Sequence, residues 1–198
     1  MMAGAMTEET KKKRGPAKAD PESLARAAYW YLERFATSAE NLRRVLMRRV
    51  EKAARAHATD RADRDDGAAV VDAIIRRLLD DGLLDDAAYA QARARVLRTA
   101  GKPARAIKWT LAGKGVGAET IDRAIAAVDA ENAGEGEDAD FRAAVRFAKR
   151  RRLGPYRDPG SAGKEARQKK DMAALARAGF SYGVAERIVK TPSREVPE

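Results

Sequence analysis

The feature of this sequence that most restricts its fold is a short pattern that recurs along the chain: a leucine, three residues, a glycine and then an apolar residue. The pattern begins at Leu78, Leu111 and Leu175, so the first two copies are 33 residues apart and the third is 64 residues further on. A glycine after a helix supplies the positive φ of a C-cap, and the apolar residue that follows can pack back onto that helix. The spacing therefore predicts tandem units, each built from helices joined by glycine turns.

The segments between the glycines have apolar residues at three- and four-residue spacing, which is typical of amphipathic helices. One such stripe follows Pro21 and consists of Leu24, Ala28, Tyr31, Leu32 and Phe35. No segment has the alternating pattern of a strand. We therefore predict an all-α fold of tandem helical bundles, which make an elongated protein.

Polar residues at the expected helix starts support these assignments. Thr37 or Ser38 can cap one helix, and Glu40 would complete a capping box with Thr37. Asp85 or Asp86 can cap another helix. The polar stretch from Ala53 to Gly67 is expected to be an exposed loop or a frayed helix end, and its His57 is not expected to be a ligand.

Changes in composition divide the chain. We predict a disordered basic tail (1–21), a first helical unit (22–82), a second helical unit (83–130), an acidic linker (131–140), a third helical unit (141–190) and a disordered tail (191–198). Because only 6% of the residues are aromatic and much of the apolar content is alanine, several small modules fit the supply of core residues better than one large domain.

Composition also limits the function. Forty lysines and arginines against thirty aspartates and glutamates give a net charge of +10, which favours nucleic acid or an acidic protein as partner. The absence of cysteine excludes disulfides and thiol chemistry, and one histidine makes a histidine-based metal site improbable. No secretory signal or membrane-spanning run is found, so we expect a cytoplasmic protein without a membrane partner.

No arrangement of residues indicates catalysis, a cofactor or a metal. Asp80, Asp81, Asp85 and Asp86 fall at a helix end and the next helix start, where aspartate has a structural use. The glycines of the segment 113–117 follow a predicted helix instead of a strand and lack the ending of a phosphate-binding loop. We expect no catalytic residues, no cofactor and no metal.

Clusters of basic residues are the better candidates for a binding site, because their repetition on successive units can give one positive strip. The candidates are Arg43, Arg44 and Arg48 on the second helix, Lys102, Arg105, Lys108 and Lys114 in the second unit, and Lys149, Arg150, Arg151, Arg152, Lys164, Arg167, Lys169 and Lys170 in the third. Trp30, Tyr31 and Trp109 are expected to pack in the core instead of anchoring a partner.

Several motifs together resemble the RecX family of recombination regulators. The first is Tyr31-Leu32-x-Arg34 with Ser38, Glu40, Leu42 and Leu46, and the second is Leu78-x3-Gly82-Leu83-Leu84-Asp85-Asp86-x2-Tyr89-Ala90. The third comprises Gly101-Lys102, Arg105, Ile107, Leu111, Lys114, Gly115 and Val116, and the last is Gly179-Phe180-Ser181-Tyr182. The order and spacing match over residues 22–190. Pro103 stands where the family usually has glycine, and no glycine follows Leu46.

The resemblance implies tandem repeats of three-helix units that form an elongated, curved array. It also implies a regulator, not an enzyme, which makes and breaks no bond. It would bind the nucleoprotein filament of the RecA recombinase, lie along its groove, and inhibit ATP hydrolysis, strand exchange and coprotease activity, which tempers the SOS response during DNA repair. We expect a monomer. The alternative from the residues alone is a helical repeat protein that binds single- or double-stranded DNA directly and without sequence specificity.

Overall fold

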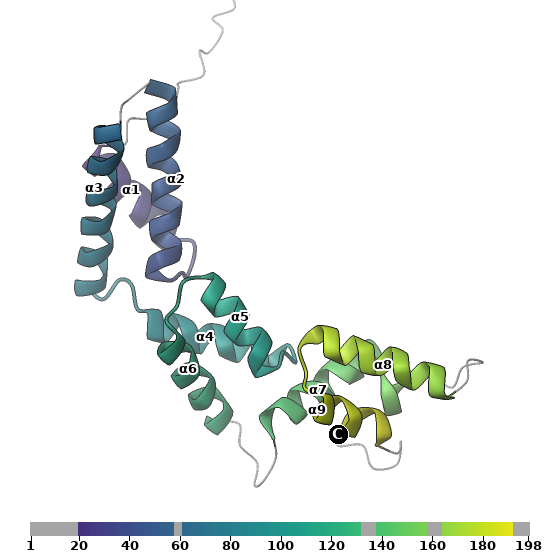
Figure 1. Cartoon of the computed structure of the whole chain (residues 1–198). Coiled ribbons are helices and arrows are strands. Elements are labelled where there is room, and N and C mark those ends of the chain that lie inside the picture. Colours follow the sequence, from purple (N-terminus) through teal and green to yellow (C-terminus); the bar gives the residue numbers. More distant parts are fainter. Residues whose placement is uncertain (1–19, 58–60, 132–137, 158–163, 192–198) are drawn as a thin grey trace, which may run out of the picture. The chain divides into compact units, whose positions relative to one another are not determined.

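The computed structural model describes residues 20–57, 61–131, 138–157 and 164–191, which form nine α-helices and one short 3-10 helix, with no strand among them (Figure 1). The helices are α1 (Pro21–Leu32), α2 (Ala39–His57), α3 (Arg61–Asp80), α4 (Asp86–Thr99), α5 (Ala104–Gly113), α6 (Ala118–Glu131), α7 (Ala139–Arg151), η1 (Gly154–Tyr156), α8 (Lys164–Ala178) and α9 (Tyr182–Lys190). The predicted tails and acidic linker lie largely outside the described residues.

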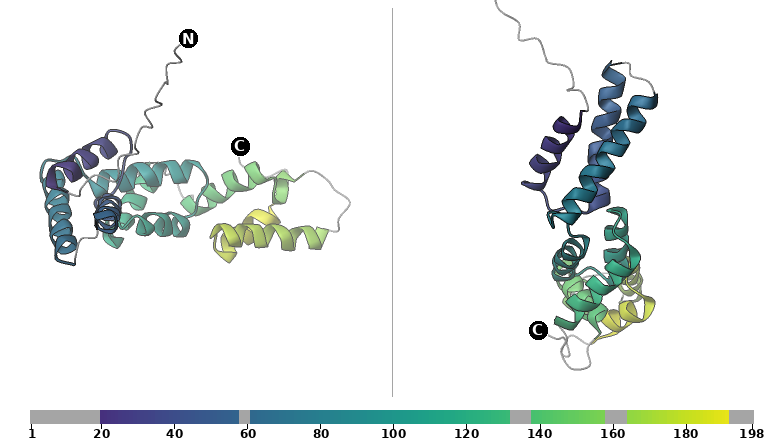
Figure 2. Two further views of the ribbon diagram at one scale, coloured as in Figure 1. Left: turned by 90° about the horizontal axis from the view of Figure 1, so that it is seen from above. Right: turned by 90° about the vertical axis from the view of Figure 1, so that its left-hand side faces the viewer.

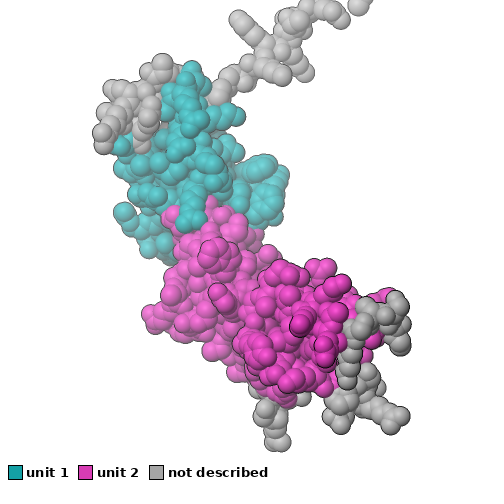
Figure 3. Space-filling view, turned by 45° about the vertical axis from the view of Figure 1, so that its right-hand side comes forward, with its two compact units in different colours: residues 1–35, 42–80 teal, residues 36–41, 81–198 magenta. Residues whose placement is uncertain are grey.

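The chain divides into two compact units (Figure 3). Unit 1 holds α1, most of α2, and α3, whereas unit 2 holds the short segment 36–41 and everything from residue 81 onward. Within unit 2, α4 to α6 form one three-helix bundle, and α7, α8 and α9 form another with η1 (Figure 2). The prediction of an all-helical chain made of three-helix units is therefore confirmed.

Each bundle has a core of aliphatic side chains and alanines. In unit 1 the largest fully buried side chains are Leu24, Leu42, Leu46, Val71 and Leu78. The second bundle buries Ala90, Ala94, Ile107, Leu111, Val116, Ile121, Ala124, Ile125 and Val128. The third adds three aromatic rings, Phe141, Phe147 and Phe180, and the centroids of the last two are 5.7 Å apart. Alanines in the core let the helices approach closely, so that few bulky residues suffice.

The prediction of an exposed loop or a frayed helix end over residues 53–67 is wrong for most of these residues. α2 continues to His57, with Ala53 and Ala54 buried, and α3 already begins at Arg61. Gly67 lies inside α3, where an added Cβ would be 2.7 Å from Cγ1 of Val50. The glycine that suggested a loop therefore lets α3 pack closely against α2.

The glycine turns predicted from the repeat are confirmed. Gly82, Gly115 and Gly179 have φ of 69°, 78° and 99°. In the second and third turns, the N–H groups of Val116 and Phe180 donate to the carbonyl oxygens five residues earlier, both at 3.2 Å. These are the hydrogen bonds of a Schellman turn.

The first turn departs from the expected packing. Leu83, which directly follows Gly82, is 53% exposed, whereas Leu84 is 3% exposed. The apolar residue that returns to the core is thus one position later than predicted.

The helix starts also distinguish between the predicted caps. Ser38, not Thr37, precedes α2, and its Oγ accepts a hydrogen bond from the N–H of Asn41 at 3.3 Å. Asn41 therefore occupies the position assigned to Glu40, and the predicted capping box is wrong. Asp85 caps α4, where its Oδ1 accepts from two N–H groups of the first turn at 2.8 and 2.9 Å.

Gly101 gives a test of the packing between the two bundles of unit 2. Its φ is 71°, and an added Cβ would be 3.0 Å from both the carbonyl oxygen of Ala143 and the nitrogen of Phe147 in α7. Because an L-residue is strained at this φ and the neighbours are backbone atoms, we expect Gly101→Ala to lower the free energy of unfolding by about 1–3 kcal/mol. Urea unfolding measures the change.

Gly113→Ala is the matched control, because Gly113 is helical and nothing lies within 4 Å of the position of its Cβ. Its free energy of unfolding should stay the same or rise by up to about 1 kcal/mol. Equal destabilisation by both substitutions would contradict the packing described at Gly101.

Candidate partner interface

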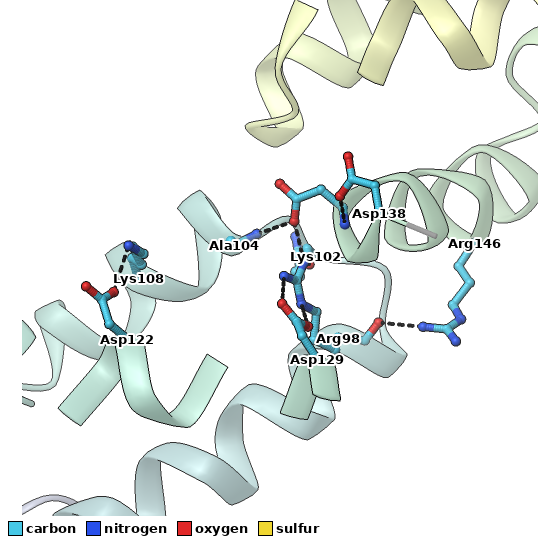
Figure 4. A network of polar contacts seen from close by, with 9 residues as sticks. Arg98, Lys102, Ala104, Lys108, Asp122, Asp129, Asp138 and Arg146 are labelled. Atoms are coloured by element: carbon cyan, nitrogen blue, oxygen red, sulfur yellow. Dashed lines mark hydrogen bonds and ion pairs between the residues drawn. The ribbon is translucent and has the colours of Figure 1, made fainter. Parts of the chain in front are cut away.

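Arg98 is the charged residue at the centre of unit 2. It lies on α4 at four-residue spacing from the buried Ala90 and Ala94, and its side chain is 7% exposed. Its Nη2 is 2.7 Å from Oδ2 of Asp129 in α6, and its Nη1 is 2.6 Å from Oδ1 of Asp140 in α7 (Figure 4). Burial alone would lower the pKa of Arg98, but hydrogen bonds and charge from both aspartates outweigh it and raise that pKa.

Asp140 also completes the start of α5. Its Oδ1 accepts the N–H of Ala104 at 2.9 Å, while Pro103, the residue before α5, provides no side-chain cap. The first N–H groups of a helix have no partner within the helix, and the helix dipole favours an anion there. A carboxylate from the third bundle therefore caps a helix of the second bundle.

Two arginines of α7 reinforce this junction. Arg146 donates to the carbonyl oxygen of Arg98 at 3.4 Å, and Arg150 donates to that of Ala100 at 2.9 Å. Both acceptors lie at the C-terminal end of α4, where cations are favoured. Arg150, predicted to contact a partner, thus has a structural hydrogen bond inside unit 2.

A second buried carboxylate organises the third bundle. Asp171 of α8 is 2% exposed and accepts the N–H of Gly154 at 2.8 Å as well as hydrogen bonds from the guanidinium of Arg157. The hydrogen bond with Asp171 raises the pKa of Arg157. Asp171 thereby fixes the turn of η1 against α8.

The basic residues predicted on α2 have different surroundings. Arg43 is half-buried, and its Nε is 2.6 Å from Oδ1 of Asp72 in α3, a hydrogen bond that lowers the pKa of Asp72. Arg44 and Arg48 are exposed. Arg43 therefore joins two helices of unit 1, whereas its two neighbours reach the surface.

In the second bundle, the predicted cation Arg105 is exposed on α5. Lys108 is 2.7 Å from Asp122 of α6, which offsets its charge (Figure 4). Lys102 precedes α5 and is half-buried, so it does not lie on a helix face with Arg105 and Lys108. Lys114 is exposed, and its Nζ is 3.3 Å from Oδ1 of Asn41.

The third bundle has exposed cations on two helices. Lys149, Arg150 and Arg151 form the last turn of α7, and Arg152 follows in the left-handed conformation, with φ of 52°. On α8, Lys169 and Lys170 are exposed and Arg167 is half-buried. Lys164 begins α8, but its side chain lies outside the described part of the chain.

A groove of about 850 Å³ lies beside α5, within unit 2. Its walls include Arg105 and Trp109 of α5, Asp122 of α6, and Arg177 and Gly179 at the end of α8. The bundles are in contact here, since an added Cβ on Gly179 would be 3.4 Å from Cγ of Pro103. The groove thus brings together residues that are distant in the sequence.

Trp109 is 83% exposed, so the expectation that it packs in the core is wrong. The buried stripe of α5 consists of Ile107 and Leu111, and Trp109 lies between them on the opposite side of the helix. Trp30 is 50% exposed, and the guanidinium of Arg34 lies 4.2 Å from the centroid of its ring. Tyr31 is half-buried and packs against Phe35, with ring centroids 5.0 Å apart.

Within the described parts of the chain, no group of three or more His, Cys, Asp or Glu residues is arranged to hold a metal. None of the helices in these parts is long and apolar enough to cross a membrane. The buried carboxylate of Asp171 and the carboxylates that contact Arg98 instead have structural partners.

Two arginines of unit 2 were not among the predicted site residues: Arg98, which forms the buried ion pairs, and Arg177, which lines the groove. Arg98 follows Ala90 and Ala94 at four-residue spacing, so a charge on an apolar stripe was the signal for a buried ion pair. Arg177 stands alone between alanines, and no local pattern marks it. Only the fold brings Arg177 to the groove beside Trp109.

Comparisons with known proteins agree with this architecture. A family model described as the second three-helix domain of RecX matches residues 85–125. The chain is 41% identical to the regulatory protein RecX of Myxococcus xanthus (strain DK1622), over 91% of this chain and 93% of that protein. It is 36% identical to the regulatory protein RecX of Agrobacterium fabrum (strain C58 / ATCC 33970), over 58% of this chain and 56% of that protein.

Two crystal structures have a similar fold. RecX from Lactobacillus salivarius gives a TM-score of 0.57 at 19% identity and covers 86% of this chain and 94% of its own. A second structure, of a regulatory protein RecX, gives a TM-score of 0.58 at 22% identity and covers 86% of this chain and 72% of its own.

Removal of the Arg98 guanidinium tests the centre of unit 2. We expect Arg98→Met to lower the free energy of unfolding by about 2–4 kcal/mol, because two carboxylates lose their partner. The loss is below that of a fully buried pair, since the side chains of Asp129 and Asp140 keep 27% and 28% exposure. Chemical unfolding monitored by circular dichroism measures it.

Arg95→Met is the matched control, because Arg95 also lies on α4 and pairs with Glu131 at 2.7 Å but is 49% exposed. Its effect should stay below about 1 kcal/mol. If Arg98→Met were as mild as Arg95→Met, the buried ion pairs would not hold unit 2 together.

Proposed function

The chain belongs to the RecX family, and on this premise we propose that it binds the nucleoprotein filament of the RecA recombinase and inhibits its ATPase, strand-exchange and coprotease activities. The observation that carries the proposal is 41% identity over 91% of the chain with a regulatory protein RecX. The proposed setting is the cytoplasm, during DNA repair and the SOS response, and the proposed binding form is a monomer.

The charge of the chain supports a partner that contains nucleic acid. The net charge is +10, and exposed cations of the third bundle lie at the end of α7 and on α8. A surface of one sign attracts a polyanion over a distance and accelerates encounter. The other two bundles also have exposed basic residues among the predicted contacts, namely Arg44, Arg48, Arg105 and Lys114.

We propose that inhibition results from occupancy of the filament and not from a chemical step. The buried ionisable groups described above are engaged in structural contacts: Arg98 with two aspartates, and Asp171 with Arg157. Contacts of this kind position helices, which is the structural role that action by occupancy requires.

The proposed function is tested by RecA ATP hydrolysis on single-stranded DNA, titrated with this protein. We expect inhibition, and we expect Lys149→Ala/Arg151→Ala to raise the half-inhibiting concentration roughly tenfold, as for two exposed contacts of about 0.7 kcal/mol each. Arg150 is left intact because of its hydrogen bond to the carbonyl oxygen of Ala100.

The control is Arg93→Ala/Arg123→Ala, which removes the same charge from exposed positions of α4 and α6. This variant should inhibit like the parent protein. Unchanged ATP hydrolysis at saturating protein, together with salt-dependent binding to bare DNA, would overturn the proposal and favour a direct DNA-binding protein.

A further inference from the structure

Trp109 is the large aromatic side chain most open to solvent among the described residues, and its environment differs from that of Trp30. It is 83% exposed, and no ring or cation from the described parts of the chain stacks on its indole. Trp30 is 50% exposed, and Arg34 covers its ring at 4.2 Å. Exposure of so large an apolar ring is unfavourable in water unless a partner covers it.

The groove that Trp109 lines is also lined by basic side chains from two bundles. Arg105 lies one helical turn before Trp109 on α5, and Arg177 comes from the last turn of α8. Lys102 also lines the groove, whereas the charge of Lys108 is offset by Asp122 at 2.7 Å. Two exposed guanidinium groups from different bundles therefore line the same groove as one exposed aromatic ring.

Most of the other side chains that line the groove are small. They are Ala106, Ala112, Ala118, Ala176 and Ala178, together with Val116 and Ile121. Val116 and Ile121 are only 5% and 3% exposed, so they offer little apolar area to a side chain inserted from a partner. The indole of Trp109 is the large exposed apolar side chain of the groove.

We propose that this groove binds one strand of single-stranded nucleic acid, with a base stacked on Trp109 and phosphates at Arg105 and Arg177. Aromatic rings beside cations are the usual platform for single strands, because every base has a face that can stack. A duplex does not fit this chemistry, since its base faces are already stacked on one another. The inference rests on the proposed function for the source of the strand, which is the DNA of a nucleoprotein filament.

An acidic peptide would satisfy the two arginines but not the indole. Carboxylates pair with guanidinium groups, yet an acidic side chain gains little from a flat aromatic face. The combination of ring and cations therefore favours a nucleotide over a peptide.

The test uses the intrinsic fluorescence of Trp109. Trp30→Phe leaves Trp109 as the sole tryptophan, and this protein is titrated with a short oligothymidine at low salt. We expect strong quenching of the emission, because a stacked base quenches indole. Polyglutamate of equal charge is titrated in parallel and should leave the emission nearly unchanged.

Substitutions then separate stacking from charge in an anisotropy assay with labelled oligothymidine. Trp109→Ala should weaken binding roughly tenfold or more, within the range known for base–aromatic stacking, and Trp109→Phe should recover part of the loss. Arg105→Gln and Arg177→Gln should each lower the slope of log affinity against log salt by about 0.7, as expected for one phosphate contact on a single strand. Trp109→Ala should leave this slope unchanged.

The matched controls lie outside the groove. Trp30→Phe removes an exposed tryptophan from unit 1, and Arg123→Gln removes one exposed positive charge from α6. Both variants should bind the oligonucleotide like the parent protein. Circular dichroism confirms that each variant is folded.

Two results would overturn the inference: no quenching of Trp109 at saturation, or equal quenching by polyglutamate. Either result leaves the proposed function intact if the protein still inhibits ATP hydrolysis by the recombinase. If the parent protein does not inhibit ATP hydrolysis but its Trp109 emission is still quenched by oligothymidine, the proposed function is wrong and the nucleic-acid site is supported.

Discussion

The two buried ion pairs of Arg98 hold unit 2 together. The side chain of Arg98 is 7% exposed, and a guanidinium buried to this extent is stable only when its charge and its N–H groups are paired. The two carboxylates that pair with it come from α6 in the second bundle and α7 in the third. Asp140 has a second role, because the same oxygen caps α5. Loss of this arrangement would leave unpaired charges and an uncapped helix in the same place.

Several of the arginines have hydrogen-bond partners within the protein. Arg146 and Arg150 donate to carbonyl oxygens at the end of α4, and Arg43 pairs with Asp72 in unit 1. These contacts leave the net charge of +10 unchanged, but they fix the positions of the guanidinium groups. Arg105 and Arg177, which line the groove with Trp109, are both exposed.

Much of the fold could be predicted from the sequence, because its determinants are local. Apolar spacing predicts the helices, and the recurring glycine predicts the turns, since positive φ at a helix end strongly favours glycine. The prediction of a loop over residues 53–67 was wrong for two reasons. The buried positions there are alanines among charged residues, which give no clear apolar stripe, and Gly67 permits close packing of α3 against Val50 instead of forming a loop. A close approach of two helices leaves no local signal.

The candidate site was predicted less well, because it depends on contacts between distant residues. Basic clusters are visible in the sequence, but whether Lys108 or Arg150 is paired depends on Asp122 and on the carbonyl oxygen of Ala100. The exposure of Trp109 could have been inferred, since it lies between Ile107 and Leu111 and must face away from them. The position of Arg177 beside that ring could not, because it requires the third bundle to be placed on the second.

The most direct test of the central claim compares the affinity of the labelled protein for a single-stranded oligonucleotide, bare or coated with RecA and a slowly hydrolysed nucleotide, at one physiological salt concentration. Fluorescence anisotropy measures both. We predict weak binding to the bare strand and much tighter binding to the coated strand, because the filament adds a protein surface to the phosphates. Equal affinity for the two would contradict the account, since the recombinase would then contribute nothing to recognition.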